Sequence, residues 1–356
     1  MKYTTRDYLD IVAPHVPQRL IDVNSMNRLA ELAATLPPSS NFGFECKLGS
    51  PAPTADFLIA VIASDGSRGA WAEEARQARG RRSHPAWEKV QRFLADWERS
   101  EGGFEPIYDT WLEFDMDGQD SEEPVPSFFF GFDHTRNDNY PDTTRTMVER
   151  LRAAPLPSAG LDTLSACFKE LPQRAQVFQI GLMLSRPTDA VRLCIKRLTA
   201  EQIATYLSHI GWPGSVAVLQ RQLESIAPLV DGMGLDLDIG QSVLPKIGIE
   251  CSIRDGSDGR DKVKAFLERL STEGYCTPGK GTAILEWLGL CTERTDRERW
   301  PAHLIKASEG LGPEVLSSFA RTLNHIKINY ESDQEIAAKA YLGVRHYWIR
   351  TRAGTS

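Results

Sequence analysis

The feature that most constrains the fold of this chain is a pattern that recurs five times: two short segments of alternating polar and apolar residues, joined by a turn. Its clearest copy spans residues 235–253, LDLDIGQSVLPKIGIECSI. Strict alternation is typical of a β-strand that has one apolar and one polar face. In an ordinary half-buried sheet the polar face is exposed to solvent, and this interpretation remains open for any single copy.

The other four copies predict hairpins of the same design. Their strands are expected over residues 41–48 and 56–63, 110–115 and 127–133, 177–184 and 190–198, and 323–330 and 337–348. Helical patterns are predicted between the hairpins, at residues 84–99, 143–153, 199–209, 215–230, 261–273 and 281–290, after an N-terminal helical segment at residues 1–38.

Repetition of these hairpins predicts a closed structure. An antiparallel sheet of about ten strands tends to curl and close, because closure removes its unpaired edges. The helices have apolar stripes of their own to bury, so we expect them on the outer, apolar face of the sheet. The predicted fold class is α+β: residues 1–356 form one domain, a closed antiparallel β-barrel in αββα repeats with a polar-lined lumen wide enough for ligands.

Composition and targeting signals exclude several classes of protein. A formal net charge of -7 argues against a general nucleic-acid binder. The N-terminus lacks the apolar core of a signal peptide, and no apolar run is long enough to span a membrane. The six cysteines form no CxxC pair and the seven histidines no HExxH motif, so we expect reduced cysteines and no protein-bound metal. We predict a cytoplasmic protein that binds neither nucleic acid nor membrane.

Two loops resemble ligand-binding motifs only in part. The string GYCTPGKG at residues 274–281 is close to a phosphate loop, but Gly281 replaces the Ser or Thr and a helix precedes it, so we predict a helix-to-helix turn. The acidic string DMDGQDSEEP at residues 115–124 lacks the spacing of a calcium loop, and we predict a solvated hairpin tip.

The polar strand faces carry many ionisable residues, which are costly to enclose unless water, a partner or a ligand meets them. The expected lumen residues are Glu45, Lys47, Glu113, Asp115, Arg192, Lys196, Asp236, Asp238, Lys246, Glu250, Lys327, Lys339, Tyr341 and Arg345.

Four strings on these strands carry a resemblance to a known family. They are FECKL at residues 44–48, VRLCIKRLT at 191–199, GLDLDIG with KIGIECS at 234–252, and KAYLG at 339–343. In their order, and in the αββα layout, the chain resembles the aromatic (ABBA) prenyltransferases. The strings look like the cyanobactin-type branch, which prenylates ribosomally made peptides.

The resemblance implies transfer of an allylic group, dimethylallyl or geranyl, from its diphosphate to an electron-rich acceptor. The leaving diphosphate needs fixed cations and hydroxyls. Arg192, Lys196, Lys327, Lys339 and Tyr341 are assigned to it, with Lys246 and Arg345 as weaker candidates. The resemblance also implies that Glu45 is the catalytic glutamate, which takes the acceptor's proton. For each of these residues an ordinary ion pair is the alternative.

The remaining carboxylates exceed what diphosphate chemistry needs. Glu113, Asp115, Asp236, Asp238 and Glu250, together with Trp111, are expected to bind the acceptor. As a hypothesis, they hold a cationic side chain such as the arginine of a peptide. The aspartate-rich DDxxD motif is absent, so Mg²⁺ is expected to arrive on the prenyl diphosphate; Asp236 and Asp238 remain a weak alternative ligand pair.

Two competing interpretations remain. A non-catalytic peptide-binding scaffold on the same barrel would have no need to gather cations on converging strands. An unrelated α+β enzyme with an open sheet would not pair the strand of Glu45 with the strand of Lys339.

Overall fold

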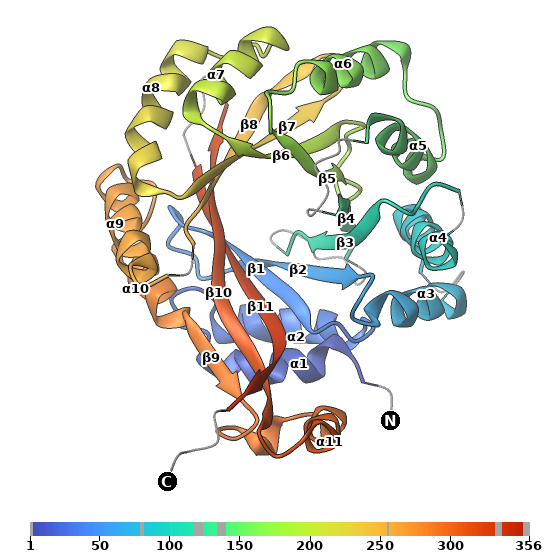
Figure 1. The fold of residues 1–356 in the computed structure, drawn as a ribbon, viewed down its shortest axis with the longest axis vertical. Helices are drawn as coiled ribbons and strands as arrows, with labels where there is room; N and C mark the ends of the chain where they lie inside the picture. Colours follow the sequence, from blue (N-terminus) through green and yellow to red (C-terminus); the bar gives the residue numbers. More distant parts are fainter. Residues whose placement is uncertain are drawn as a thin grey trace.

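One antiparallel sheet of 11 strands organises the chain, in the order β11-β1-β2-β3-β4-β5-β6-β7-β8-β10-β9, and β10 also pairs with β11. We analysed a computed structural model, which describes residues 3–78, 82–100, 102–116, 124–133, 140–254, 256–331 and 337–351. Because β10 joins both β8 and β11, ten strands close into a ring and β9 stays outside it. The predicted closed barrel of αββα repeats is confirmed (Figure 1).

The strands are β1 Asn41–Lys47, β2 Ala55–Ile62, β3 Ile107–Phe114, β4 Pro126–Phe132, β5 Gln176–Leu182, β6 Val191–Leu198, β7 Gly232–Ile239, β8 Val243–Ser252, β9 Gly289–Thr292, β10 Val315–Tyr330 and β11 Ala337–Arg350. The α-helices are α1 Thr5–Val12, α2 Val23–Ala34, α3 Ser67–Gln77, α4 Pro85–Arg99, α5 Pro141–Arg152, α6 Ser158–Lys169, α7 Ala200–His209, α8 Val216–Ile226, α9 Gly259–Thr272, α10 Pro278–Trp287 and α11 Ala302–Leu311. The 3₁₀ helices are η1 Ala13–His15, η2 Ala227–Leu229 and η3 Arg297–Arg299.

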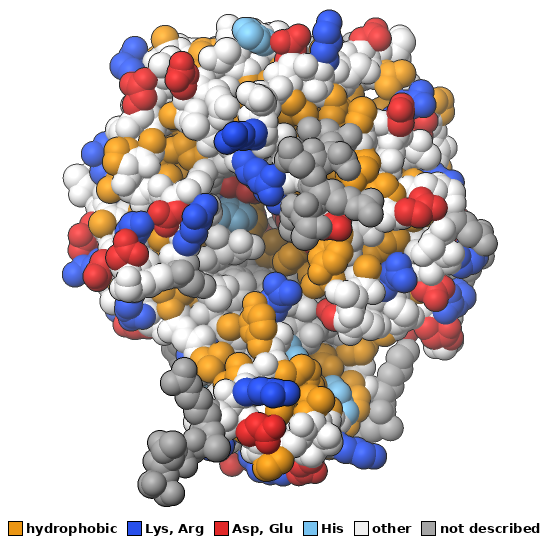
Figure 2. Space-filling view, in the orientation of Figure 1, with side chains coloured by type: hydrophobic (Ala, Val, Ile, Leu, Met, Phe, Trp, Pro, Cys, Tyr) orange, Lys and Arg blue, Asp and Glu red, His pale blue; other side chains and the backbone are white. Residues whose placement is uncertain are grey.

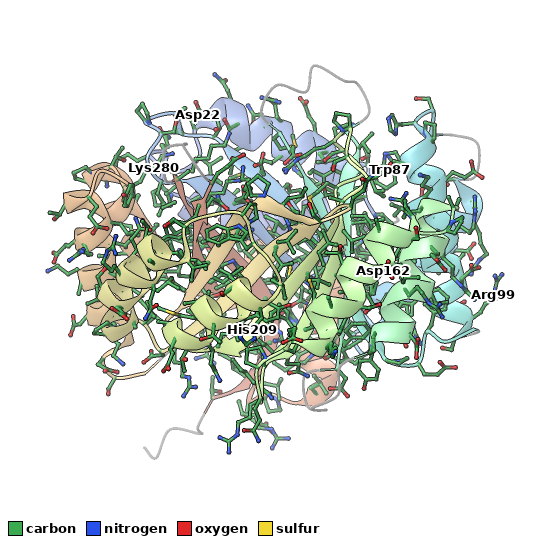
Figure 3. All side chains as sticks on the ribbon, turned by 90° about the horizontal axis from the view of Figure 1, so that it is seen from above. Asp22, Trp87, Arg99, Asp162, His209 and Lys280 are labelled. Carbon is green, nitrogen blue, oxygen red and sulfur yellow. The ribbon has the colours of Figure 1, made fainter. Side chains whose placement is uncertain are left out.

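The hydrophobic core lies between the outer face of the barrel and the surrounding helices, which enclose the strands in Figures 1 and 3. Helix α4 shows how the sequence builds this layer. It begins with Pro85 at its first turn, and its apolar stripe faces the sheet. The ring of Phe93 lies 5.0 Å from that of Phe128 and 5.7 Å from that of Phe130, both on β4. Burial of such aromatic pairs stabilises the barrel from outside and leaves its polar face inward.

The first and last strands of the chain close the barrel. Strand β1 pairs with β11 in antiparallel register, with Glu45 opposite Tyr341 and Lys47 opposite Lys339. The interpretation as an open sheet is therefore wrong. Closure brings together side chains that lie nearly the whole chain apart.

Several elements differ from the prediction. Helix α3 was not predicted, because its sequence is only weakly amphipathic. Elements α6, α11 and β9 were not predicted either. Strand β10 begins at Val315 rather than at residue 323. Its first half was not predicted, because residues 315–322, VLSSFART, do not alternate between polar and apolar. Most of the acidic string at 115–124 lies outside the described residues.

One predicted turn is confirmed. The GYCTPGKG string forms a turn between α9 and α10. Its lysine, Lys280 (labelled in Figure 3), is buried and donates hydrogen bonds to the carbonyls of Lys47 at 2.6 Å and Ala52 at 2.7 Å, which is a structural role. All six cysteines are free and buried. None of the helices in the described ranges is long and apolar enough to cross a bilayer.

Candidate functional site

The lumen contains two cavities that meet in the middle of the barrel. The wide cavity, of about 640 Å³, opens where β3 and β5 begin, and a narrow one, of about 40 Å³, lies where they end. Leu58, Glu113, Lys327 and Tyr341 line both. Figure 2 shows a hollow in the face of the molecule, with hydrophobic side chains inside it and Lys and Arg side chains at its rim. We call the wide cavity the mouth and the other the narrow end.

Glu45 is held at the narrow end by two residues from the strand that closes the barrel. The Lys339 ammonium group donates a hydrogen bond to one carboxylate oxygen of Glu45, and the Tyr341 hydroxyl donates to the other. Burial alone raises the pKa of Glu45, but the charges of Lys339 and Lys327 and these two hydrogen bonds outweigh burial and lower it to about 2. Glu45 is therefore ionised and rigidly oriented.

Lys327 occupies the boundary between the two cavities. Its Nζ lies 3.1 Å from Oδ2 of Asp236 and 4.6 Å from the centroid of the Tyr341 ring. The ion pair is almost fully enclosed, with side-chain exposures of 10% and 5%. Burial lowers the pKa of Lys327, but the negative charges of Asp236 and Glu45 raise it by more, so the net shift in its pKa is upward. A permanent cation thus lies at the centre of the lumen.

The narrow end gathers further cations on neighbouring strands. Arg192 forms a two-bond pair with Asp238, its cross-strand partner, at 2.8 Å for each bond. Arg186 forms a similar pair with Asp115, at 2.8 and 3.1 Å. Lys246 also lines this cavity, but its side chain is largely exposed. Rigid guanidinium forks and a flexible ammonium group thus lie side by side at this end of the lumen.

Aromatic residues form one wall of the mouth. Trp111 and Phe178 pack against a small buried cluster of Phe129, Met183 and Cys194, separate from the main core. Lys196 reaches this wall, with Nζ 5.4 Å from the Phe178 ring centroid. Burial and nearby Arg197 lower the pKa of Lys196 to about 8. This part of the cavity offers ring faces to a cation or an apolar chain.

The mouth also holds carboxyl groups that are buried without a strong cation beside them. Burial raises the pKa of Asp109 and of Glu113 to about 7. Burial and the neighbouring charge of Asp236 raise the pKa of Glu250 well above its usual range. His325 lies 3.6 Å from Glu250, but burial and the charge of Lys327 lower its pKa to about 3, so it is neutral. These carboxyl groups therefore bind protons far more readily than Glu45 does.

Most predicted site residues meet in the lumen, but not all at one point. Those that line the narrow end are Glu45, Glu113, Asp115, Arg192, Lys246, Lys327, Lys339 and Tyr341. Those that line the mouth are Trp111, Glu113, Lys196, Asp236, Glu250, Lys327 and Tyr341. Lys196 is thereby separated from the cations of the narrow end.

Three expected lumen residues, Lys47, Asp238 and Arg345, line neither cavity, and Lys47 is exposed. Arg345 lies on the luminal face of β11 but past the end of the ring, exposed, with its guanidinium 5.3 Å from the Tyr347 ring centroid. The carboxylate of Asp238 is taken up by Arg192. Alternation correctly predicts on which face of the sheet a side chain lies, but it does not predict the position of that side chain along the barrel axis.

Sequence reasoning missed several lining residues. Asp109 and His325 continue the alternating pattern of β3 and β10 and were recognisable from it. Asp56 begins the luminal face of β2, and burial together with Glu45 raises its pKa to about 6. Arg186 comes from the turn after β5, and no periodic signal marks it. Within the described ranges, no group of three or more His, Cys, Asp and Glu residues is placed to hold a metal ion.

Comparison with known proteins identifies the fold. No family model matches the chain, and no curated protein matches its sequence. It is similar in structure to 5-dimethylallyltryptophan synthase from Streptomyces coelicolor, with a TM-score of 0.52, 13% identity and 95% of each chain covered. It is also similar to the prenyltransferase PriB, with a TM-score of 0.55, 12% identity and coverage of 95% of this chain and 94% of that one. These likenesses establish the ABBA barrel fold.

Proposed function

We propose that the protein is a prenyltransferase that moves a dimethylallyl or geranyl group from its diphosphate to a side chain of a ribosomally made peptide, with arginine as the acceptor. One observation carries the proposal: a cation-lined narrow cavity opens, past Lys327 and Tyr341, into a wide cavity lined by aromatic side chains and carboxyl groups. Donor ionisation, cation shielding and acceptor binding each have a matching region.

The narrow end suits the diphosphate. Lys327, Lys339 and Arg186 present donors to its lining, together with Arg192 and Lys246. When the allylic C–O bond breaks, the electron pair stays on the diphosphate, and these fixed cations stabilise the developing charge. The structure of 5-dimethylallyltryptophan synthase from Streptomyces coelicolor in complex with DMASPP and Trp supports a diphosphate donor. We propose that Mg²⁺ arrives on the diphosphate, since Glu45 and Asp115 at the narrow end already bind Lys339 and Arg186.

The allylic cation formed in this way must be shielded from water. The Tyr341 ring lies between the two cavities, and Trp111 and Phe129 form the wall beyond it. Ring faces attract a cation and exclude water. We propose that the prenyl chain points from the narrow end toward this wall.

Arginine is favoured as acceptor by the carboxyl groups of the mouth. A guanidinium group bound there pairs with Glu113, Asp236 and Glu250 and offsets the cost of their burial. Attack of a guanidine nitrogen on the cation forms the C–N bond and releases one proton. Glu113 has a pKa of about 7 and suits proton acceptance better than Glu45, whose pKa is about 2. We therefore propose that Glu45 stabilises positive charge and fixes Lys339 and Tyr341.

Mass spectrometry tests the proposal. Peptides that differ in one residue, Arg, Trp, Tyr, His or Ser, are incubated with the protein, Mg²⁺ and dimethylallyl or geranyl diphosphate. We expect one prenyl mass on the arginine peptide, lost with Lys339→Ala and kept with Lys264→Ala, an exposed lysine on α9. Gain on another residue would correct the acceptor. No gain on any peptide, and no binding of a thiolodiphosphate analogue, would favour the non-catalytic scaffold.

A further inference from the structure

The last hairpin extends well past the barrel. Strand β10 runs from Val315 and β11 to Arg350, and β9 pairs with the outer part of β10 at residues 318–321. Together they form a three-stranded extension beside α11, at the bottom of Figure 1. Asp109, near the start of β3, and His325, which follows the outer part of β10, both line the mouth. The mouth therefore opens at the end of the barrel from which the hairpin extends. The extension therefore lies next to the mouth and not beside the narrow end.

One face of the extension continues the luminal face of β11. Tyr341 lines the mouth, and residues at every second position after it, through Arg345 to Tyr347, lie on the same face. In register with Arg345 are Ala320 and, beyond it, Leu290 of β9. From Tyr347 to Tyr341 the face spans about 20 Å, at about 3.3 Å per residue. A chain lying along the extension thus leads directly into the mouth.

The outer edge of the extension is an open β-strand edge. Strand β1 pairs with β11 only as far as Arg345, and the amide of His346 donates to the carbonyl of Ser40 at 3.2 Å. The backbone groups of Trp348 and Arg350 point to the same side, because backbone direction alternates along a strand. No strand in the described part of the chain pairs with them there. Their N–H and C=O groups are free to accept another strand.

The surface of the extension is unusually apolar for this molecule. Six large hydrophobic residues are exposed among those described, and four of them, Leu290, Leu311, Tyr347 and Trp348, belong to β9, α11 and β11. Two exposed cations, Arg345 and Arg350, lie on either side of Tyr347 and Trp348 in the sequence of β11. Two copies paired edge to edge would place like charges close together, which disfavours a second copy. An extended peptide with acidic residues complements the edge in hydrogen bonding, apolar contact and charge.

We propose that the acceptor peptide binds as an added strand on the outer edge of β11, at residues 346–350, and passes over the luminal face into the mouth. This inference rests on the proposed function and assigns the mode of substrate binding. Main-chain hydrogen bonds supply affinity in such strand addition, while alternate side chains supply selectivity. The distance to Tyr341 places the modified arginine about six to eight residues from the residue that pairs with Trp348.

A synthetic peptide tests this arrangement. It has roughly 16 residues, one arginine, and an alternating valine and glutamate segment about seven residues before that arginine. Its truncated form keeps only the arginine and one residue on each side. Hydrogen exchange of the full chain is measured with a non-hydrolysable donor analogue and either peptide. We expect the amides of residues 346–350 to exchange at least tenfold more slowly with the long peptide and unchanged with the truncated one.

Steady-state kinetics give a second readout. Trp348→Pro removes an outward N–H that no described residue uses, so we expect the KM of the long peptide to rise at least tenfold, toward that of the truncated peptide. Trp348→Thr keeps the N–H and separates the backbone effect from the side-chain effect. Val218→Ser, an exposed residue of α8 at the opposite end of the molecule in Figure 1, is the matched control and should leave KM unchanged.

The outcomes separate this inference from the proposed function. Prenylation with equal KM for both peptides and no protection of residues 346–350 would overturn strand addition and keep the transferase. Protection without prenylation of any peptide would keep strand addition and overturn the transferase. Protection in the absence of peptide, with sedimentation as a dimer that Trp348→Pro dissociates, would assign the edge to a second copy and overturn the inference.

Discussion

Two sets of carboxyl groups, one at each end of the lumen, are in opposite states. At the narrow end Glu45 and Asp115 are bonded to Lys339 and Arg186. In the mouth, Asp109 and Glu250 form no ion pair with Lys or Arg in the described ranges, and burial raises their pKa. The same enclosure thus gives a fixed charge where a cation is bonded to the carboxylate and a raised pKa where none is. A barrel separates these functions because each strand carries residues to both ends.

The largest effect is expected from breaking the central ion pair with Lys327→Met. This change leaves Asp236 and Glu45 enclosed without their shared cation. Removing one partner of a buried pair costs about 3–5 kcal/mol. We expect the free energy of unfolding, measured with urea, to fall by that amount.

The matched control for this change is Lys262→Met. Lys262 also bonds an aspartate, Asp231, at 2.8 Å, but its side chain is 41% exposed. We expect the denaturation midpoint of this variant to stay at the wild-type value. Equal losses from the two variants would contradict the distinction between enclosed and exposed pairs.

The next largest effect is expected in catalysis, from Glu45→Gln. Glutamine keeps the shape and an oxygen for Tyr341 but removes the negative charge that Lys339 meets. Loss of one preorganised electrostatic group lowers kcat by roughly 10²–10³-fold. Steady-state prenylation of the arginine peptide measures it. Unchanged kcat would show that Glu45 is only structural. The control is Glu88→Gln, which changes an exposed side chain of α4.

A pH dependence sharpens the contrast from the side of the mouth. The pKa of Glu113 is raised from 4.5 to about 7, so its contribution to stability is complete below 4.5 and is lost as pH rises through 7. Glu113→Gln should remove about 2–3 kcal/mol of the stability that the wild type loses between pH 5 and pH 8. Urea unfolding across this range measures the slope. Parallel curves for the two proteins would mean that Glu113 is ionised throughout.

The smallest effect is expected from Arg186→Met, at the outer rim of the narrow end. This side chain is 46% exposed, so its pair with Asp115 adds little to stability. Its role in donor binding should appear as a rise of about tenfold in the Kd of a thiolodiphosphate analogue, measured by calorimetry. Arg19→Met removes a similarly exposed pair with Glu286 and should leave this Kd unchanged. Equal affinity in both variants would remove Arg186 from the donor site.

Much of the lumen could be predicted, because alternation along each strand shows which side chains face inward and closure of the sheet brings those faces together. Glu45, Lys339 and Tyr341 each lie on the polar face of a clearly alternating strand, and pairing of the first and last strands follows from closing the sheet. The helices were predicted where their apolar stripe is wide, as in α4, and missed where it is weak, as in α3.

The rest depends on geometry that a sequence pattern does not carry. Arg192 was expected to be available for diphosphate, but the register places it directly opposite Asp238. Arg186 enters the site from a turn, whose path follows from tertiary packing. The height of Arg345 along the barrel depends on where the ring ends, and β10 continues beyond that point.

Closure by the last hairpin also has a consequence for how the protein is made. During synthesis β1 and β8 emerge before β10 and β11, and each has an unpaired edge until those strands bridge them. Contacts of such long sequence separation form slowly. Glu45 must therefore wait for Lys339 and Tyr341, nearly 300 residues later, before the lumen exists. A nascent chain of this kind needs protection of its open edges on the ribosome until its final residues are released.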